Sequence, residues 1–331
     1  LMDLIAVLDD KKADTSTVYD SKGGRIQYYG RSVKDSNGKG YGKISLARGF
    51  ELSSNTILVQ SVYDSYKSNP KQFVDRINSY GLNKPLGLPI KGEGIPVIPQ
   101  PGTNRWSGVA LPWMAFGYGL SVTPLQTLTL YNAVANDGVM VKPIFVSEIK
   151  EWNKTIKKFD TQVINPKICS QETLDKVHAV LENVVKKGTG SKLYSKDFSM
   201  AGKTGTAQVN YKDKSKLYYA SSFVGYFPAD EPKYSCIVVV HKPNVAAGYY
   251  GADVAGPVFK RIAQKIFTDS PSMNHVKNID AKVVSQEKNY AEYYKKVEKE
   301  ERIVPNVKGM EGMDAVALLE NLGLKVKVIG V

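Results

Sequence analysis

The chain has 331 residues, of which 42% are hydrophobic and 23% are charged. A chain of this length and composition can bury a large core, so it is expected to form one large domain or two smaller ones. It contains no run of about 18 apolar residues, the length that a membrane-spanning helix needs. Because Leu1 lies within an apolar stretch, the chain is interpreted as a fragment whose anchor or export signal lies outside it.

The balance of charge is strongly positive. Forty-five Lys and Arg residues against 32 Asp and Glu residues give a formal net charge of +13, which would favour nucleic acid, a phospholipid surface or an acidic polymer as partner. The lysines are scattered, and no basic helix or RNA-binding aromatic signature accompanies them, so a solvated surface without nucleic acid is favoured. Cys169 and Cys236 lack the spacing of a disulfide framework or zinc site, and the histidines are too scattered to indicate a catalytic triad.

The first 81 residues predict helices separated by a loop-rich segment. Residues 1–8 place leucines and an isoleucine at helical spacing, which predicts the end of a buried helix. Residues 11–43 are polar and Gly-rich, which is typical of loops and short strands. Further helices are expected from about Ser45, from an N-cap at Ser53 or Ser54, and over residues 72–80 before Gly81.

The central and later segments predict helices around a small sheet. Residues 87–112 are rich in Gly and Pro, a long loop of the kind that belongs to functional surfaces. Helices are expected from Thr123-Pro124 to residue 135 and over residues 171–187, where Gly188 is the stop signal. The expected antiparallel meander occupies residues 200–209, 220–227 and 234–241, and the helix expected to cover it occupies residues 254–267.

The C-terminal part changes character at about residue 269. Residues 269–302 are rich in lysine and glutamate and are interpreted as a charged linker or solvated helix. Residues 303–331 restart as strand, helix and strand, but about 29 residues are too few for an independent core, so a truncated module is expected. The predicted domain boundaries are therefore 1–268, 269–302 and 303–331.

Two short motifs carry chemistry: Ser53-Ser54-Asn55 at a helix start and Lys203-Thr204-Gly205-Thr206 in a strand. Each is weak alone, because Ser-Ser-Asn is usually a helix cap and Lys-Thr-Gly occurs by chance. Their order is informative, since serine acyltransferases of the β-lactamase and penicillin-binding type use S-x-x-K, then S-x-N, then K-T-G. Four Ser-x-x-Lys matches, beginning at Ser36, Ser68, Ser147 and Ser285, are treated as coincidence because none precedes Ser53 on a buried helix start.

Four longer sequence segments support the interpretation of these motifs as those of a serine acyltransferase. Residues 117–126 (GYGLSVTPLQ) and 131–138 (YNAVANDG) strongly resemble class B penicillin-binding proteins, as do residues 201–208 (AGKTGTAQ) and 223–229 (FVGYFPA). The resemblance covers roughly residues 1–267. Residues 304–324 are similar to the first half of a PASTA module, and a transpeptidase with this tail resembles the division-specific septal type.

The resemblance implies an α/β (α+β) fold of the penicillin-binding transpeptidase and β-lactamase type, with an antiparallel sheet flanked by helices and a helical subdomain. It implies a peptidoglycan D,D-transpeptidase that cross-links stem peptides through a serine acyl-enzyme in septal wall synthesis and is acylated by β-lactams. The nucleophilic serine and its lysine would then lie upstream of Leu1, and the fragment would be inactive. A D,D-carboxypeptidase or β-lactamase-like hydrolase, and a non-catalytic wall-binding scaffold, remain as alternatives.

The same resemblance implies a catalytic set of Ser53, Asn55, Lys203 and Thr206. Ser53 would relay a proton to the leaving amine, and Asn55 would hydrogen-bond the substrate amide. Lys203 would attract the terminal carboxylate, while the backbone N–H of Thr206 would bind the oxyanion. Gly205 is expected to keep the strand edge accessible. The substrate-binding residues are expected to be Ser54, Thr204, Gly205, Thr206, Ala207 and Gln208, without a metal or cofactor.

Partners and location follow from the same resemblance. The expected partners are peptidoglycan stem peptides, lipid-linked precursor strands, β-lactams, a glycosyltransferase and membrane proteins of the divisome. The expected location is the periplasmic side of the cytoplasmic membrane, with an N-terminal anchoring helix that this chain does not contain.

Overall fold

The computed structural model describes residues 1–210, 213 and 215–269, and near the C-terminus residues 307–309, 315–316, 319–320 and 323–328. The chain divides into two units, Leu1–Met273 and Asn274–Val331. The predicted linker, beyond Asp269, lies outside the described residues, and the predicted PASTA module is described only at the few positions above. Both therefore stay predictions, and the fold below is that of the first unit.

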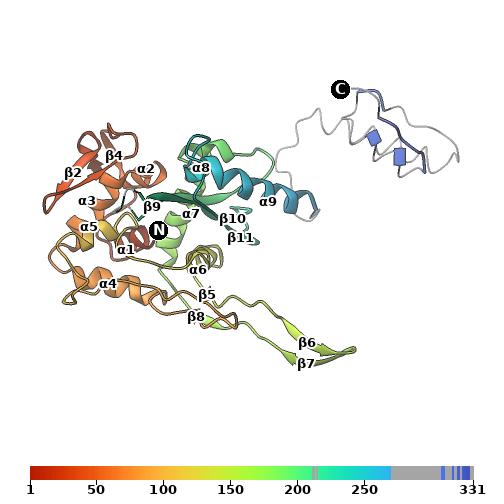
Figure 1. The fold of residues 1–331 in the computed structure, drawn as a ribbon, viewed down its shortest axis with the longest axis horizontal. Coiled ribbons are helices and arrows are strands. Elements are labelled where there is room, and N and C mark those ends of the chain that lie inside the picture. Colours follow the sequence, from red (N-terminus) through yellow and green to blue (C-terminus); the bar gives the residue numbers. More distant parts are fainter. Residues whose placement is uncertain are drawn as a thin grey trace. The chain divides into compact units, whose positions relative to one another are not determined.

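An antiparallel sheet of three strands lies at the centre of this unit, in the order β11-β10-β9 (Figure 1). Its strands are β9 (Ala201–Val209), β10 (Tyr218–Phe227) and β11 (Tyr234–His241). The predicted meander is confirmed, although β10 begins two residues earlier than expected. Among the described strands β9 pairs only with β10, so its other edge is open.

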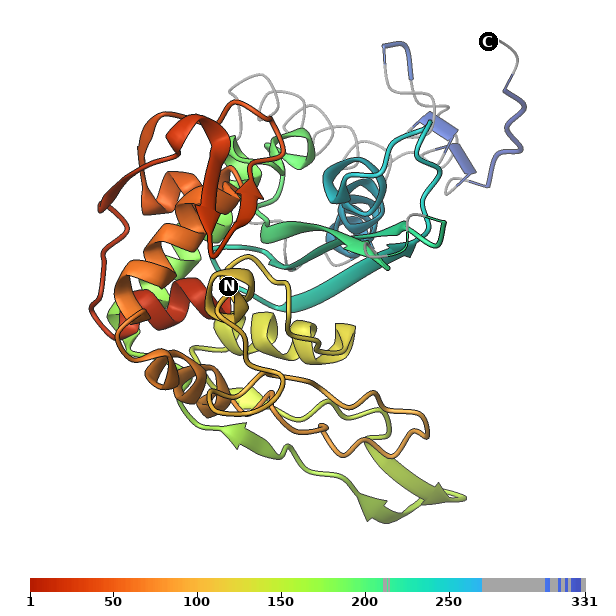
Figure 2. The same ribbon diagram turned by 60° about the vertical axis from the view of Figure 1, so that its left-hand side comes forward.

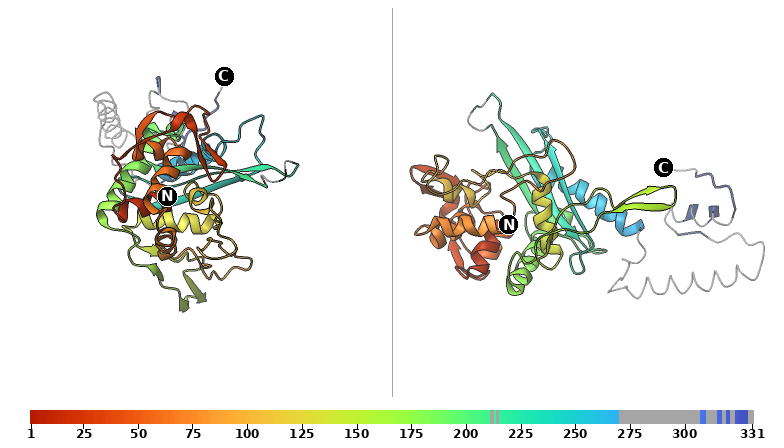
Figure 3. Two further views of the ribbon diagram at one scale, coloured as in Figure 1. Left: turned by 90° about the vertical axis from the view of Figure 1, so that its left-hand side faces the viewer. Right: turned by 90° about the horizontal axis from the view of Figure 1, so that it is seen from below.

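Different helices cover the two faces of the sheet (Figure 3). Helix α9 (Gly256–Asp269) packs Phe259 against Phe223 and Phe227 on one face, with ring centroids 4.7 and 5.7 Å apart. On the other face, Val224 belongs to the main hydrophobic core of the unit. Successive side chains of a strand point to opposite faces, which explains why neighbouring residues of β10 join different cores.

The register of the sheet assigns the side chains of β9 to these two faces. Lys203 pairs with Val224, so the Lys203 side chain lies on the face of the main core. Thr204 pairs with Phe223 and lies on the face that α9 covers. The lysine of the Lys-Thr-Gly motif is thus directed toward the helical part of the unit.

The helical part is built around a buried first helix (Figure 2). Helix α1 (Met2–Asp9) buries six consecutive residues, Asp3 to Leu8, as its leucine spacing predicts. The helices that follow are α2 (Leu46–Glu51), α3 (Asn55–Tyr66), α4 (Pro70–Ser79) and α5 (Ala110–Met114). Tyr66 of α3 is fully buried and donates a hydrogen bond of 3.0 Å to the carbonyl of Ala6 in α1.

The later helices begin at capping residues, of which Thr123 was predicted from the sequence. Thr123 caps α6 (Pro124–Ala135): its hydroxyl accepts from the Gln126 N–H, and the Gln126 side chain accepts from the Thr123 N–H. Ser170 caps α7 (Gln171–Lys187), whose bounds match the prediction. A short helix, α8 (Gly251–Val254), precedes α9 and was not expected as a separate element.

Small ladders complete the unit. Two of them lie in the Gly-rich segment: β1 (Val18–Asp20) with β4 (Lys43–Ser45), and β2 (Arg25–Tyr28) with β3 (Arg31–Lys34). Two more were not anticipated: β5 (Met140–Val141) with β8 (Val163–Asn165), and β6 (Glu148–Glu151) with β7 (Lys154–Lys158). The turns at Lys22–Gly24 and Ser191–Leu193 are 3₁₀ helices. No helix in the described part of the chain is long and apolar enough to cross a bilayer.

Candidate active site

Lys203 and Ser53 are in direct contact, although 150 positions separate them in the chain. The ammonium of Lys203 donates a hydrogen bond to the Ser53 hydroxyl and another, of 3.2 Å, to the carbonyl of Thr204. Ser53 lies in the turn between α2 and α3, and Lys203 lies on β9. The structure therefore brings together one residue from each of the two motifs.

The surroundings of Lys203 favour loss of its proton. Its Nζ lies 5.5 Å from the centroid of the Phe50 ring. Burial lowers the pKa of Lys203 to about 8, while the carboxylate of Asp3, in the first turn of α1, opposes this shift. An amine with a pKa near the working pH can both give and take a proton, which suits a relay with the Ser53 hydroxyl.

The backbone at Ser53 is in the left-handed region, with φ of 54°. A side chain in this conformation costs roughly 1 kcal/mol relative to the common regions. The turn is fixed on its far side by the N–H of Ser54, which donates a 2.8 Å hydrogen bond to the carbonyl of Gly49. Ser53 is thus held in the conformation that presents its hydroxyl to Lys203.

Ser54 is placed differently from the expectation that it contacts substrate. Its side chain is fully buried, and its hydroxyl lies 3.1 Å from both carboxylate oxygens of Asp35. The same hydroxyl accepts from the Ile57 N–H and so caps α3. Asp35 also accepts hydrogen bonds of 2.9 Å from the N–H and the hydroxyl of Thr56. Ser54 therefore supports the start of α3 and does not face the site.

Asn55 is the first residue of α3 and is half-buried. Its side-chain amide donates a 2.8 Å hydrogen bond to the carbonyl of Lys34, at the end of β3. This bond fixes the carboxamide plane, and the Oδ1 atom keeps the capacity to accept from a substrate N–H. Asn55 stands two residues from Ser53, immediately beside the buried Asp35 cluster.

The open edge of β9 carries the backbone donors of the site. The N–H of Gln208 donates a 3.0 Å hydrogen bond to the Tyr118 hydroxyl, on the side away from β10. Alternate residues of a strand direct their N–H groups to the same edge, so the N–H groups of Thr206 and Thr204 also point to the open edge. The resemblance places an oxyanion donor at Thr206.

The side chains of the threonines are held from behind the strand. The hydroxyls of Thr204 and Thr189 lie 2.8 Å apart. The Thr206 hydroxyl accepts a 3.0 Å hydrogen bond from the N–H of Gly251, which leaves its own proton to be donated to an acceptor such as a carboxylate. Ala207 and Gln208 are exposed at the end of the motif.

Gly205 lies two residues from Lys203 along β9, on the same face of the strand. A Cβ atom there would lie 2.5 Å from the Ser222 hydroxyl, on the neighbouring strand. From the other side, a Cβ atom at Gly251 would lie 2.5 Å from the Gly205 carbonyl and 2.3 Å from the Ser222 carbonyl. A side chain at position 205 would therefore crowd Ser222 on the site face, whereas the missing side chain of Gly251 lets α8 approach β9 and β10 from the opposite face. That Gly205 keeps the strand edge accessible to substrate stays a prediction.

Three residues that shape the site were not predicted from the sequence: Asp35, Tyr118 and Gly251. The sequence offered a signal only for Tyr118, which stands between Gly117 and Gly119 in the segment 117–126 that resembles class B penicillin-binding proteins. Asp35 and Gly251 belong to no recognisable motif, and their roles are recognised only from their contacts in the structure. In the described residues no group of three or more His, Cys, Asp or Glu side chains could hold a metal ion.

Residues 1–264 match the family model described as the penicillin binding protein transpeptidase domain. The chain belongs to this family. Stage V sporulation protein D of Bacillus subtilis is 30% identical over 255 residues, which cover 75% of this chain and 36% of that protein. Peptidoglycan D,D-transpeptidase FtsI of Escherichia coli is 32% identical over 191 residues, covering 57% and 30%.

A solved structure agrees with the family. Penicillin binding protein 3 of Mycobacterium tuberculosis, complexed with aztreonam, superposes with a TM-score of 0.68 at 26% identity, covering 81% of this chain and 60% of that one. The mixed α/β fold of the transpeptidase domain is therefore shown. The transpeptidase domain described here spans about a third of the length of the curated relatives named above.

Proposed function

We propose that the full-length protein is a peptidoglycan D,D-transpeptidase that cross-links stem peptides in the septal wall during cell division. The observation that carries the proposal is the contact between Lys203 and Ser53 beside the open edge of β9. A relay and an edge of backbone donors are two of the parts that acyl transfer from a D-Ala-D-Ala peptide needs. The septal assignment rests on the resemblance of the C-terminal residues to a PASTA module.

The nucleophile in this proposal is a serine N-terminal to Leu1. Its hydroxyl gives its proton to the lysine expected beside it, its oxygen attacks the carbonyl of the penultimate D-Ala, the N–H of Thr206 binds the oxyanion, and the bond to the terminal D-Ala breaks. The Ser53 hydroxyl donates a proton to the departing amine and takes one from the Lys203 ammonium. The amine of a second stem peptide then attacks the ester and loses a proton, and a proton returns to the serine oxygen as it leaves, which completes the cross-link.

The recognition of the substrate is assigned to three groups. Lys203 and the Thr206 hydroxyl bind the terminal carboxylate, and Asn55 accepts from a peptide N–H. The substrates are stem peptides on lipid-linked precursor strands, at the periplasmic face of the cytoplasmic membrane. A glycosyltransferase and membrane proteins of the divisome are the proposed partners, and β-lactams the proposed inhibitors, as aztreonam binds the M. tuberculosis protein.

Labelling with a fluorescent penicillin tests the proposal. The full-length protein is expected to form a stable covalent adduct on a serine before Leu1, whereas the 331-residue chain alone should remain unlabelled. A folded full-length protein that never labels, or an adduct on Ser53, would refute the assignment. Rapid turnover of a chromogenic cephalosporin would instead identify a hydrolase.

The pKa of Lys203 gives a pH dependence. The ammonium is present below about pH 8 and is lost as the pH rises through that value. We therefore expect the second-order rate of acylation by a carboxylate-bearing β-lactam to fall toward higher pH, with its midpoint near the Lys203 pKa. Rates measured between pH 6 and 10 at constant ionic strength check this, and a Lys203→Arg variant, which stays charged, should lose the midpoint. A profile that stays flat through this range in the unaltered protein would contradict the assignment.

A further inference from the structure

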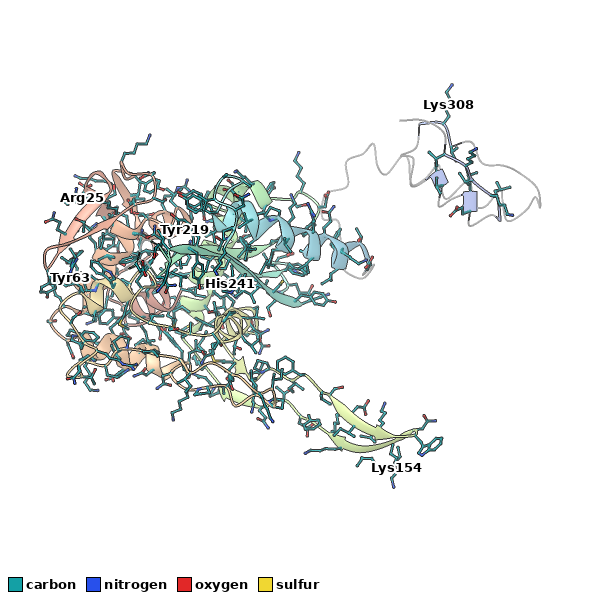
Figure 4. The ribbon with its side chains drawn as sticks, viewed as in Figure 1. Arg25, Tyr63, Lys154, Tyr219, His241 and Lys308 are labelled. Atoms are coloured by element: carbon teal, nitrogen blue, oxygen red, sulfur yellow. The ribbon has the colours of Figure 1, made fainter. Side chains whose placement is uncertain are left out.

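The segment of residues 144–163, called the arm here, extends from the body of the domain and ends at the β6–β7 turn (Figure 4, which labels Lys154). Every residue of β6 and β7 is exposed. The exposed residues of the arm include eight large hydrophobic side chains, namely Ile144, Phe145, Val146, Ile149, Trp152, Ile156, Phe159 and Val163. A concentration of exposed apolar side chains on a projecting element indicates an interaction surface.

The root of the arm is fixed to the body of the domain. Met140 of β5 is fully buried, and β5 pairs with β8. The side chain of Asn165, at the end of β8, donates a 2.7 Å hydrogen bond to the carbonyl of Ser79 in α4. The arm is therefore held at its base. Strands β6 and β7 bury no residue, and a two-stranded hairpin without a core is at best marginally stable in water.

The two faces of the arm differ in polarity. Ile149 pairs with Lys157, and Phe159 follows two residues later, so these three side chains share one face. The Nζ of Lys157 lies 4.8 Å from the centroid of the Phe159 ring. At the tip, in the turn between the two strands, the Trp152 side chain is 96% exposed.

The opposite face is polar and is satisfied within the arm. Lys150 pairs with Thr155 and Glu148 with Lys158, which places all four on this face. Glu148 accepts a 2.9 Å hydrogen bond from the Thr155 hydroxyl and forms a 2.7 Å ion pair with Lys150. The polar side chains of this face thus bind one another within the arm. The apolar face is therefore the surface available to another molecule.

Charge distinguishes the possible occupants of the apolar face. Glu151 pairs with Lys154 on the side of Ile149, so this face carries two lysines and one glutamate. The whole arm holds four lysines against three acidic residues, fewer net charges than the clusters of roughly four to eight basic residues that bind anionic membranes. A second copy of the chain would present the same face, with its excess of lysine over glutamate, on both sides of the contact. A protein surface with carboxylates around an apolar centre fits better.

We propose that the apolar face of the arm binds a partner protein whose contact surface is apolar at its centre and carries carboxylates opposite Lys154 and Lys157. Trp152, Ile149 and Phe159 supply the buried anchors of this contact, as exposed aromatic side chains do in protein interfaces. The two lysines supply the charge that selects the partner and speeds its association.

A crosslinking experiment in cells, followed by a matched pair of variants, tests this. The photoreactive amino acid p-benzoylphenylalanine replaces Trp152 in the full-length protein, and the crosslinked molecule is identified and purified. Ile149→Lys and Thr155→Lys each add the same side chain, one on the apolar face and one on the polar face. We expect Ile149→Lys to weaken binding of the purified partner by roughly tenfold or more and Thr155→Lys to change it less than about twofold.

Further readouts separate the other occupants. Lys157→Glu should slow association at low salt, and this effect should shrink as salt is added. Both lysine variants must unfold at the temperature of the unaltered chain, which their exposed positions favour. Crosslinks to lipid alone, to a second copy alone, or to nothing would overturn the proposal. So would equal effects of the two lysine variants, or a partner surface that is basic opposite Lys157.

Discussion

Replacement of Lys203 by alanine is expected to slow acylation of the full-length protein by a β-lactam by roughly 100- to 1000-fold. The variant removes both the positive charge beside the substrate carboxylate and the proton partner of Ser53. The loss of one such charge-stabilising group typically costs about 3 kcal/mol of transition-state stabilisation. The measurement is the second-order rate constant for a fluorescent penicillin, followed in real time on the purified protein.

Two further variants show what Lys203 contributes. Lys265→Ala removes a lysine of α9 that forms a 2.9 Å ion pair with Asp269, and its acylation rate should equal that of the unaltered protein. Lys203→Arg keeps the charge but cannot give up a proton to Ser53. If arginine restores the rate, charge alone matters; if it does not, proton transfer through Ser53 is required. Acylation of Lys203→Ala at the unaltered rate would exclude the relay.

Replacement of Asp35 by alanine is expected to lower the free energy of unfolding by about 3 to 5 kcal/mol. Asp35 is 3% exposed, and its carboxylate accepts hydrogen bonds from Ser54 and from two groups of Thr56. Removal of the carboxylate leaves buried donors without an acceptor, each of which costs about 1 to 3 kcal/mol. Urea unfolding of the 331-residue chain, followed by circular dichroism, measures the change.

A matched control for this variant is Asp64→Ala, in the same helix that the Asp35 cluster begins. The Asp64 side chain is 56% exposed and lies 3.4 Å from Lys67, so its loss should change stability by less than about 0.5 kcal/mol. A loss of under about 1 kcal/mol for Asp35→Ala would show that water replaces the carboxylate and that the cluster does not hold the start of α3.

Local rules were sufficient where a segment carries its own boundary signals. Thr123-Pro124 predicted the start of α6, and the capping box with Gln126 is present. The apolar stripe of α7 and its stop at Gly188 gave both ends of that helix. The strands of the central sheet were recognisable because their β-branched and aromatic residues are bounded by turn residues.

The sequence could not predict features that depend on contacts between distant residues. Ser54 stands beside Ser53 in the motif, and only the buried carboxylate of Asp35, 19 positions earlier, shows that one serine caps a helix while the other meets Lys203. The close approach of Ser222 to Gly205 was likewise hidden, because the two residues meet only in the folded sheet. The arm escaped prediction since its exposed strands lack the one-sided burial that produces alternation.

The left-handed backbone at Ser53 sets folding and chemistry against each other at one position. Glycine would occupy that conformation without steric penalty, so it would lower the energy of the folded turn relative to serine. Any screen that rewards only heat resistance would therefore enrich glycine at position 53 and discard the hydroxyl that touches Lys203. In thermostabilised variants of this domain, residue 53 should be sequenced first, because selection for stability alone favours a variant that is more stable but cannot transfer a proton at this position.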